Sequence, residues 1–140
     1  MLLSTAAIIR QGRKFFLARR MPTGSMASRW EFPGGKVEVG ETPEQGLARE
    51  LEEEFGIHAH IGSLLFTTCF RNNEIEYRLI SFEATIGEPP VFLAEHTEIG
   101  WFTLEEIEGL NLADSDRVLF QKLKPYFILR FQAECSRSLE

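Results

Sequence analysis

Residues 43–55 restrict the possible folds of this chain most strongly, because the sequence marks both ends of a helix there. Thr42 is a favourable N-cap residue, Pro43 suits the first helical position, and Gln45 completes a capping box with Thr42. Gly56 is placed to end the helix in the left-handed conformation. The sequence therefore predicts one well-delimited helix around which the remaining elements must pack.

This helix has an apolar side and an acidic side that adjoin each other. The apolar side, which we expect to face the core, consists of Leu47, Ala48, Leu51 and Phe55. Glu50, Glu53 and Glu54 fall within a sector of roughly 100° beside it, at the edge of the core. Like charges four residues apart destabilise a helix, and a divalent cation would offset this repulsion. Such carboxylates suit Mg²⁺ or Mn²⁺, and a solvated acidic surface is the common alternative.

The charges are unevenly distributed along the first part of the chain. Residues 1–37 contain seven basic side chains and one acidic side chain, whereas residues 38–54 contain seven glutamates and one arginine. One segment could hold an anion while the other holds cations, and two solvated surfaces of opposite sign are the alternative. The pair Gly34-Gly35 lies between them, and glycine lets a backbone carbonyl come close to an ion.

The remaining sequence predicts a mixture of strands and helices. Strands are expected at 4–10, 14–20, 61–70, 75–85 and 98–102, with a short extended piece at 30–32 and a loop at 21–29. Thr103 with Glu106 opens a short helix, and a last helix is expected from Ser115 to about Phe127, disturbed at Pro125. This order predicts an α/β (α+β) sandwich with a mixed sheet rather than a doubly wound parallel sheet.

Composition excludes several classes of protein. The 140 residues correspond to one domain, which we expect to span residues 1–130 and to be followed by a tail at 131–140. The net charge of −6 argues against binding to a nucleic-acid polymer, and no apolar run is long enough to span a membrane. Cys69 and Cys135 form no CxxC pair, which excludes a thiolate zinc site and fits a reducing, cytoplasmic location.

The segment GGKVEVGETPEQGLARELEEEFGI resembles the Nudix box. The box consists of a glycine, five residues, a glutamate, seven residues, and then Arg-Glu-apolar-x-Glu-Glu-x-Gly-apolar. Its constrained positions are occupied here by Gly35, Glu41, Arg49, Glu50, Leu51, Glu53, Glu54, Gly56 and Ile57, without a departure. ARR before the box, WEFPGGK leading into it and a glutamate before the EIGW strand resemble the MutT-like branch of this family.

The resemblance implies a Nudix-type α/β/α sandwich and Mg²⁺-dependent hydrolysis, with Mn²⁺ as a possible substitute. It implies that the metal ligands are Glu50, Glu53, Glu54, the loop carboxylate Glu95 and a backbone carbonyl of Gly34 or Gly35. Glu98 competes with Glu95 for the loop position. Arg49 is expected to orient the carboxylates by bidentate hydrogen bonds. Glu41 is expected to be structural or to support the ligands.

The same resemblance implies a site for a nucleotide. The candidate substrate-binding residues are Arg20, Arg29, Glu31, Phe32, Lys36 and Asp116. Asp114 is the alternative to Asp116 for recognition of the base. A single loop histidine such as His96 is more often solvated than catalytic.

The implied reaction is cleavage of oxidised or noncanonical (d)NTPs, of the 8-oxo-dGTP or CTP type, to a nucleoside monophosphate and pyrophosphate. The alternatives are hydrolysis of ADP-ribose or a nucleotide sugar, and a non-catalytic nucleotide sensor. The protein is expected to be a monomer or homodimer.

Overall fold

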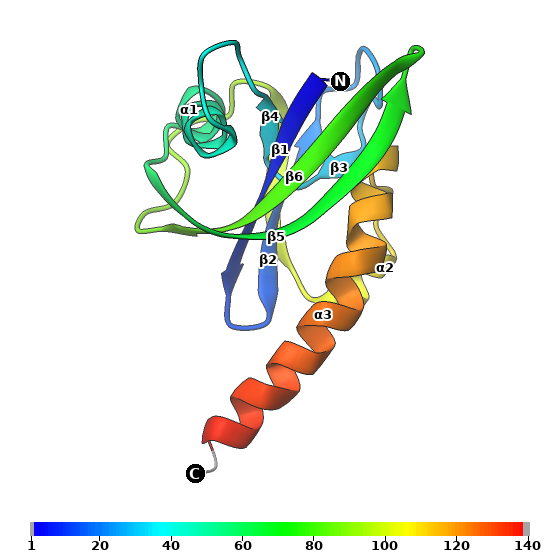
Figure 1. Ribbon diagram of the computed structural model, residues 1–140. Coiled ribbons are helices and arrows are strands. Elements are labelled where there is room, and N and C mark those ends of the chain that lie inside the picture. The colour runs from blue at the N-terminus through cyan, green and yellow to red at the C-terminus, as the bar shows by residue number, and fades with distance from the viewer. Residues whose placement is uncertain (1, 139–140) are drawn as a thin grey trace.

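The computed structural model describes residues 2–138, which form a sheet flanked by helices (Figure 1). The strands are β1 (Leu2–Gln11), β2 (Lys14–Arg20), β3 (Trp30–Glu31), β4 (Gly34–Lys36), β5 (Ala59–Asn72), β6 (Ile75–Ile86) and β7 (His96–Phe102). The helices are α1 (Pro43–Phe55), α2 (Leu104–Glu108) and α3 (Asp114–Ser138). In the part of the chain described, no helix is long and apolar enough to cross a membrane.

The sheet is mixed, as predicted. Its order is β3-β2-β1-β6-β5, with β4 paired to β1 and β7 paired to β2. β1 and β6 run parallel, and the pairs β1–β2, β1–β4, β2–β3, β2–β7 and β5–β6 are antiparallel. The strand β4 was not predicted, because three residues of Gly-Gly-Lys carry no strand signal. It exists because its backbone pairs with Ser4, Thr5 and Ala6 of β1.

Both faces of the sheet are buried, and the alternation of side chains along β1 and β2 divides them between two cores. The core under α2 and α3 includes Ala6, Ile8, Phe15 and Leu17. The core under α1 includes Ala7, Ile9, Phe16 and Ala18 together with Leu47, Leu51 and Phe55 of the helix. α1 covers one face and α3 the other, which confirms the predicted α/β/α sandwich (Figure 1).

The helix α1 begins and ends where the sequence predicts. Thr42 Oγ1 accepts a hydrogen bond from the Gln45 amide at 3.1 Å, and Gln45 Oε1 accepts one from the Thr42 amide at 2.9 Å. Gly56 has φ 66° and closes the helix in the left-handed conformation. The local caps therefore place the acidic side of α1 at a defined position against the sheet.

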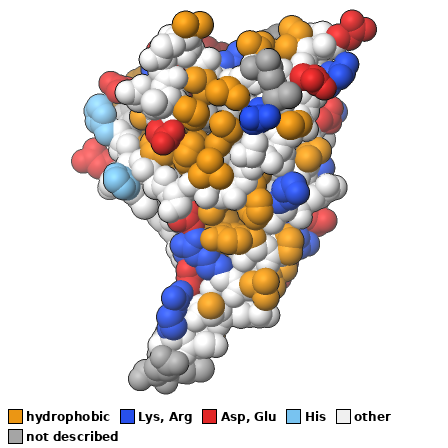
Figure 2. All heavy atoms as spheres, viewed as in Figure 1, with side chains coloured by type: hydrophobic (Ala, Val, Ile, Leu, Met, Phe, Trp, Pro, Cys, Tyr) orange, Lys and Arg blue, Asp and Glu red, His pale blue; other side chains and the backbone are white. Residues whose placement is uncertain are grey.

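The prediction that the last helix ends near Phe127 is wrong. α3 continues through Pro125 to Ser138 and projects beyond the sheet (Figure 1). Phe131 is 7% exposed, and the Arg10 guanidinium forms an ion pair with Glu134 at 2.5 Å. These long-range contacts stabilise the helical turns after Phe127. Hydrophobic side chains also reach the surface on this projecting part and over β5 and β6 (Figure 2).

Candidate active site

The backbone of β4 is pressed closely between β1 and the acidic side of α1. A Cβ atom on Gly35 would lie 2.5 Å from Cδ of Glu50, and one on Gly34 would collide with the carbonyl oxygen of Thr5. Glycine is therefore required at position 34, where the neighbour is backbone, whereas a side chain at position 35 would push the Glu50 carboxylate aside. The Gly35 carbonyl oxygen accepts hydrogen bonds from the hydroxyl groups of Thr5 at 3.0 Å and Ser4 at 3.3 Å.

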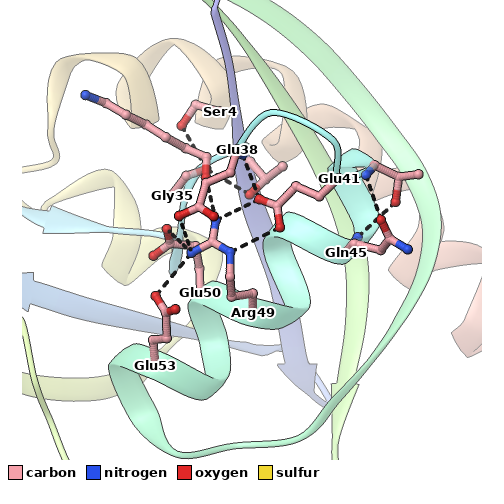
Figure 3. A network of polar contacts seen from close by, with 11 residues as sticks. Ser4, Gly35, Glu38, Glu41, Gln45, Arg49, Glu50 and Glu53 are labelled. Atoms are coloured by element: carbon pink, nitrogen blue, oxygen red, sulfur yellow. Dashed lines mark hydrogen bonds and ion pairs between the residues drawn. The ribbon is translucent and has the colours of Figure 1, made fainter.

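Arg49 is the centre of a polar network that ties α1 to the preceding loop (Figure 3). Its Nε and Nη2 donate to the two carboxylate oxygens of Glu41 at 3.1 and 2.8 Å, and Nη2 also donates to the Lys36 carbonyl at 3.0 Å. Nη1 donates to Glu50 at 3.0 Å and to Glu53 at 3.1 Å. The bidentate pair thus joins Arg49 to Glu41, whereas each of the other two glutamates receives one bond.

These hydrogen bonds explain the protonation state of the network. The Arg49 guanidinium holds the pKa of the Glu41 carboxyl below its ordinary value, and Glu41 in turn raises the pKa of Arg49. Glu41 also accepts a hydrogen bond from the Glu38 amide at 2.7 Å. Glu41 therefore fastens the loop to the helix, which agrees with a supporting role.

Glu54 lies in an electrostatic environment in which a cation would be stabilised. Its Oε2 atom is buried and has no hydrogen-bond partner among the described residues. Burial, followed by the charge of Glu50 and further repulsion from Glu31 and Glu95, raises the pKa of Glu54 to about 9. A buried carboxylate oxygen facing other carboxylates fits a bound metal ion, because the ion would supply the missing partner.

The predicted ligands are only partly gathered. Glu50 is 16% exposed beside Gly35, whereas Glu53 is 60% exposed and turns toward Arg49 (Figure 3). Glu95 is exposed immediately before β7, within electrostatic reach of Glu54. Within residues 2–138, no three Asp, Glu, His or Cys side chains already stand in a geometry that would hold a metal ion.

The loop that carries Glu95 is anchored on the end of α1. The amides of Val91 and Phe92 donate to the Phe55 carbonyl at 2.9 and 3.4 Å, and the Ala94 amide donates to the Glu54 carbonyl at 3.0 Å. These amides satisfy carbonyl groups that a helix end would otherwise leave unpaired. The loop therefore brings Glu95 toward the same turn of α1 that carries Glu54.

Glu31 joins two residues that sequence reasoning did not connect. Its Oε1 accepts a hydrogen bond from Arg20 Nη1 at 3.0 Å, and its Oε2 lies 2.8 Å from His96 Nε2. The expectation that His96 is solvated is wrong, since its side chain is 1% exposed and stacks on Phe55 at 5.1 Å. His96 Nδ1 is buried without a partner among the described residues, which costs about 1–3 kcal/mol.

Asp116, in the first turn of α3, lies against Phe32, the residue that follows Glu31. It is 6% exposed, and its Oδ1 accepts a hydrogen bond from the buried Phe32 amide at 2.9 Å. Burial, and then the charge of Glu31, raises the pKa of Asp116 to about 7. Asp114 is exposed and pairs with Arg29 at 2.8 Å. Of the two candidates, Asp116 is therefore the buried carboxyl group and Asp114 the exposed one.

Two of the predicted phosphate-binding side chains contact residues other than the glutamates of α1. Arg29 also donates to the Leu112 carbonyl at 3.2 Å, so it lies at the start of α3. Lys36 is exposed, with its Nζ 5.5 Å from the centre of the Tyr77 ring. Arg20, the third predicted basic residue, binds the carboxylate of Glu31.

The comparisons with known proteins agree with this arrangement. A family model described as NUDIX domain matches residues 2–123. The chain belongs to the Nudix family. This Nudix hydrolase is 36% identical over 121 residues to a CTP pyrophosphohydrolase of Escherichia coli (strain K12), which covers 83% of this chain and 86% of that protein. It is 36% identical over 126 residues to an 8-oxo-dGTP diphosphatase of Haemophilus influenzae, which covers 84% of this chain and 88% of the relative.

A solved structure of similar fold is described as the MutT protein from Methanosarcina mazei Go1. It matches with a TM-score of 0.77 and 32% identity, covering 95% of this chain and 94% of that chain. The predicted MutT-like resemblance and enzyme class of this Nudix hydrolase are thereby confirmed. Nudix hydrolases generally need a divalent metal such as Mg²⁺.

Proposed function

We propose that this Nudix hydrolase cleaves nucleoside triphosphates, with oxidised or noncanonical (d)NTPs of the 8-oxo-dGTP or CTP type as substrates, to a nucleoside monophosphate and pyrophosphate. The observation that carries the proposal is the buried Oε2 of Glu54, which has no hydrogen-bond partner among residues 2–138 and faces the charge of Glu50. The Glu50 carboxylate in turn lies against Gly35. The names of the relatives support the substrate class.

The proposed ligands of Mg²⁺, or of Mn²⁺ in its place, are Glu50, Glu53, Glu54, Glu95 and a carbonyl of Gly34 or Gly35. The Gly34 carbonyl is the better candidate of the two, because the Gly35 carbonyl already accepts two hydroxyl groups. Glu53 joins this set by rotation of an exposed side chain, for which there is room in solvent. When bound, a divalent ion neutralises phosphate oxygens as the P–O bond breaks.

The residues of this chain supply the rest of the reaction. A carboxylate of the cluster accepts the proton of a water molecule, whose oxygen forms a bond to the β-phosphorus. The bond from the β-phosphorus to the bridging oxygen breaks, and the nucleoside monophosphate leaves with that oxygen. Nη1 of Arg49 keeps Glu50 oriented, since the other nitrogens of Arg49 are fixed by Glu41. The bond from Nη1 to Glu53 breaks when Glu53 rotates to join the ligands.

The proposed base pocket contains Glu31, Phe32 and Asp116. Carboxylate oxygens accept hydrogen bonds, so they favour a base that presents an exocyclic amine or a ring N–H. Cytosine and 8-oxoguanine both present such donors. Arg20, Arg29 and Lys36 remain proposed contacts of the phosphates.

The test is a panel of natural and oxidised (d)NTPs, ADP-ribose and nucleotide sugars, assayed with Mg²⁺ and with product identification. We expect pyrophosphate and a nucleoside monophosphate from at least one triphosphate. Glu53→Gln is expected to lower turnover by orders of magnitude, whereas Glu52→Gln on the exposed side of the same helix serves as the matched control.

Other outcomes of the panel would contradict the proposal. Formation of AMP and a sugar phosphate would identify a hydrolase of other diphosphates. Tight binding of nucleotides without turnover in Mg²⁺ and Mn²⁺ would identify a sensor. The monomeric or homodimeric state and the cytoplasmic location stay predictions.

A further inference from the structure

The pairing of β2 with β7 contains an irregularity next to the candidate active site. Arg19 of β2 lies opposite Glu98, but the next residue, Arg20, lies opposite His96. Thr97 is therefore an extra residue in β7, as in a β-bulge. In a regular ladder, Thr97 would face Arg20 and the His96 side chain would point to the opposite face of the sheet.

This bulge places three polar side chains on one face. Arg20 and Ala18 share a face of β2 because side chains alternate along a strand, and Glu31 of β3 lies opposite Ala18. The shifted register adds His96 of β7 to the same face. Segments that are more than sixty residues apart in the sequence thus meet around the carboxylate of Glu31.

The carboxylate of Glu31 is held at both oxygens. Arg20 Nη1 binds Oε1 at 3.0 Å, and His96 Nε2 lies 2.8 Å from Oε2. The His96 ring is itself oriented by Phe55 of α1, because the two rings stack at an interplanar angle of 17°. Stacking fixes the ring plane and therefore the direction in which Nε2 can donate.

The position of Glu31 links the two ends of the site. Its neighbour Phe32 donates its amide hydrogen to Asp116 of the proposed base pocket, and its partner His96 stacks on Phe55, which directly follows Glu54 on α1. The buried Nδ1 of His96 has no partner in the described part of the chain, which is unfavourable for a side chain that serves packing alone. An aliphatic residue would fill this position without leaving an unsatisfied nitrogen.

We propose that His96 is a positioning residue, which holds the Glu31 carboxylate between the catalytic glutamates and the base pocket so that Glu31 can bind the nucleotide. The inference rests on the function proposed above, because Glu31 is there a substrate contact. His96 acts through Glu31 and does not touch the substrate. The bulge at Thr97 exists, on this view, to aim His96 at Glu31.

A double-mutant cycle of His96→Leu and Glu31→Gln tests the proposal in the full-length protein. Two quantities are measured: kcat/KM with the triphosphate that the wild type cleaves fastest, and the Kd of its α,β-methylene analogue. We expect His96→Leu to weaken both by about 10–100-fold, with the kinetic loss in KM rather than kcat. In the Glu31→Gln background, we expect the same substitution to cost less than about threefold, since its target is already lost.

Controls separate positioning from a structural role. His96→Gln keeps an N–H donor and is expected to recover part of the KM, and nitrogen-15 NMR is expected to show a proton on Nε2 of His96 in the wild type. His58→Leu, at an exposed histidine after α1, is expected to change neither quantity. The Tm of His96→Leu is expected to stay within a few degrees of the wild type.

The following results would overturn the proposal. If the losses of kcat/KM and of affinity from the two single mutants multiply in the double mutant, His96 does not act through Glu31. A fall in the Tm of His96→Leu that is large enough to account for its lost activity would show that His96 is only structural. If the wild type binds the analogue but cleaves no triphosphate, the proposed function fails and the cycle on Kd still decides the role of His96. A wild type that binds no nucleotide contradicts both.

Discussion

Replacement of Glu54 by glutamine is expected to stabilise the protein when no divalent metal is present. In the folded protein, burial and the neighbouring carboxylates raise the pKa of Glu54 from 4.5 to about 9. In the unfolded chain, this carboxyl ionises near its ordinary pKa. Unfolding above about pH 4.5 therefore releases a proton, which favours the unfolded state increasingly as the pH rises. Glutamine has no proton to release in either state.

The pKa shift sets the size of this effect. The stabilising contribution of protonated Glu54 is complete below its unfolded pKa and is lost as the pH rises from 4.5 toward 9. At about 1.4 kcal/mol per pH unit, the loss reaches about 3.5 kcal/mol at pH 7. The free energy of unfolding of Glu54→Gln is thus expected to exceed that of the wild type by up to about 3.5 kcal/mol near pH 7, and the difference is expected to vanish near pH 4.5.

Urea unfolding measures the difference directly. Wild type, Glu54→Gln and the control Glu52→Gln are unfolded between pH 4.5 and 8 in EDTA, and again in millimolar Mg²⁺. The metal is expected to stabilise the wild type by mass action and to stabilise Glu54→Gln much less, because one of its proposed ligands is gone. The two variants are expected to have the same m-value.

The reasoning would be refuted if Glu54→Gln were no more stable than the wild type near neutral pH in EDTA. It would also be refuted if a gain persisted unchanged at pH 4.5, because the gain could then not arise from ionisation. A similar gain in Glu52→Gln would show that any lost negative charge on α1 has this effect.

Further changes give equally distinct results. Gly35→Ala puts a methyl group 2.5 Å from Cδ of Glu50, a proposed metal ligand, so steady-state kinetics is expected to show a loss of activity of more than about 100-fold. Gly87→Ala, with open space at its Cβ, is expected to leave the activity unchanged. Arg49→Lys keeps the positive charge but loses the bidentate pair with Glu41, so both Tm and kcat are expected to fall. A variant with the Tm and kcat of the wild type would contradict the role of the network. Phe131→Ala is expected to lower the free energy of unfolding in urea by about 3–5 kcal/mol. A loss near zero would mean that the last turns of α3 do not support the fold.

The local features of this structure could be read from the sequence. The ends of α1 follow from Thr42 and Gly56, and its buried side follows from the spacing of its apolar residues. The acidic sector containing Glu50 and Glu54 follows from the helical period alone. These features depend on residues within a few positions of one another, which is why a single sequence is enough to predict them.

Long-range features could not be predicted. The burial of His96 depends on a bulge in β7 and on a partner in β3, and no local pattern indicates either. The extension of α3 depends on contacts of Phe131 and Glu134 with the β1–β2 hairpin, which outweigh the local cost of Pro125. The choice of Glu41 as bidentate partner of Arg49 likewise depends on how the loop before α1 folds back.

The anchoring of the loop at residues 91–94 on the carbonyl groups of α1 has a consequence for protein engineering. The last turn of α1 carries the Glu54 side chain, and its carbonyl groups bind the loop that carries Glu95. The positions of the two carboxylates therefore depend on the helix and the loop together. A chimaera that received the box of another family member without its matching loop would lose the alignment of the two carboxylates. Recombination between family members therefore needs to exchange both segments at once.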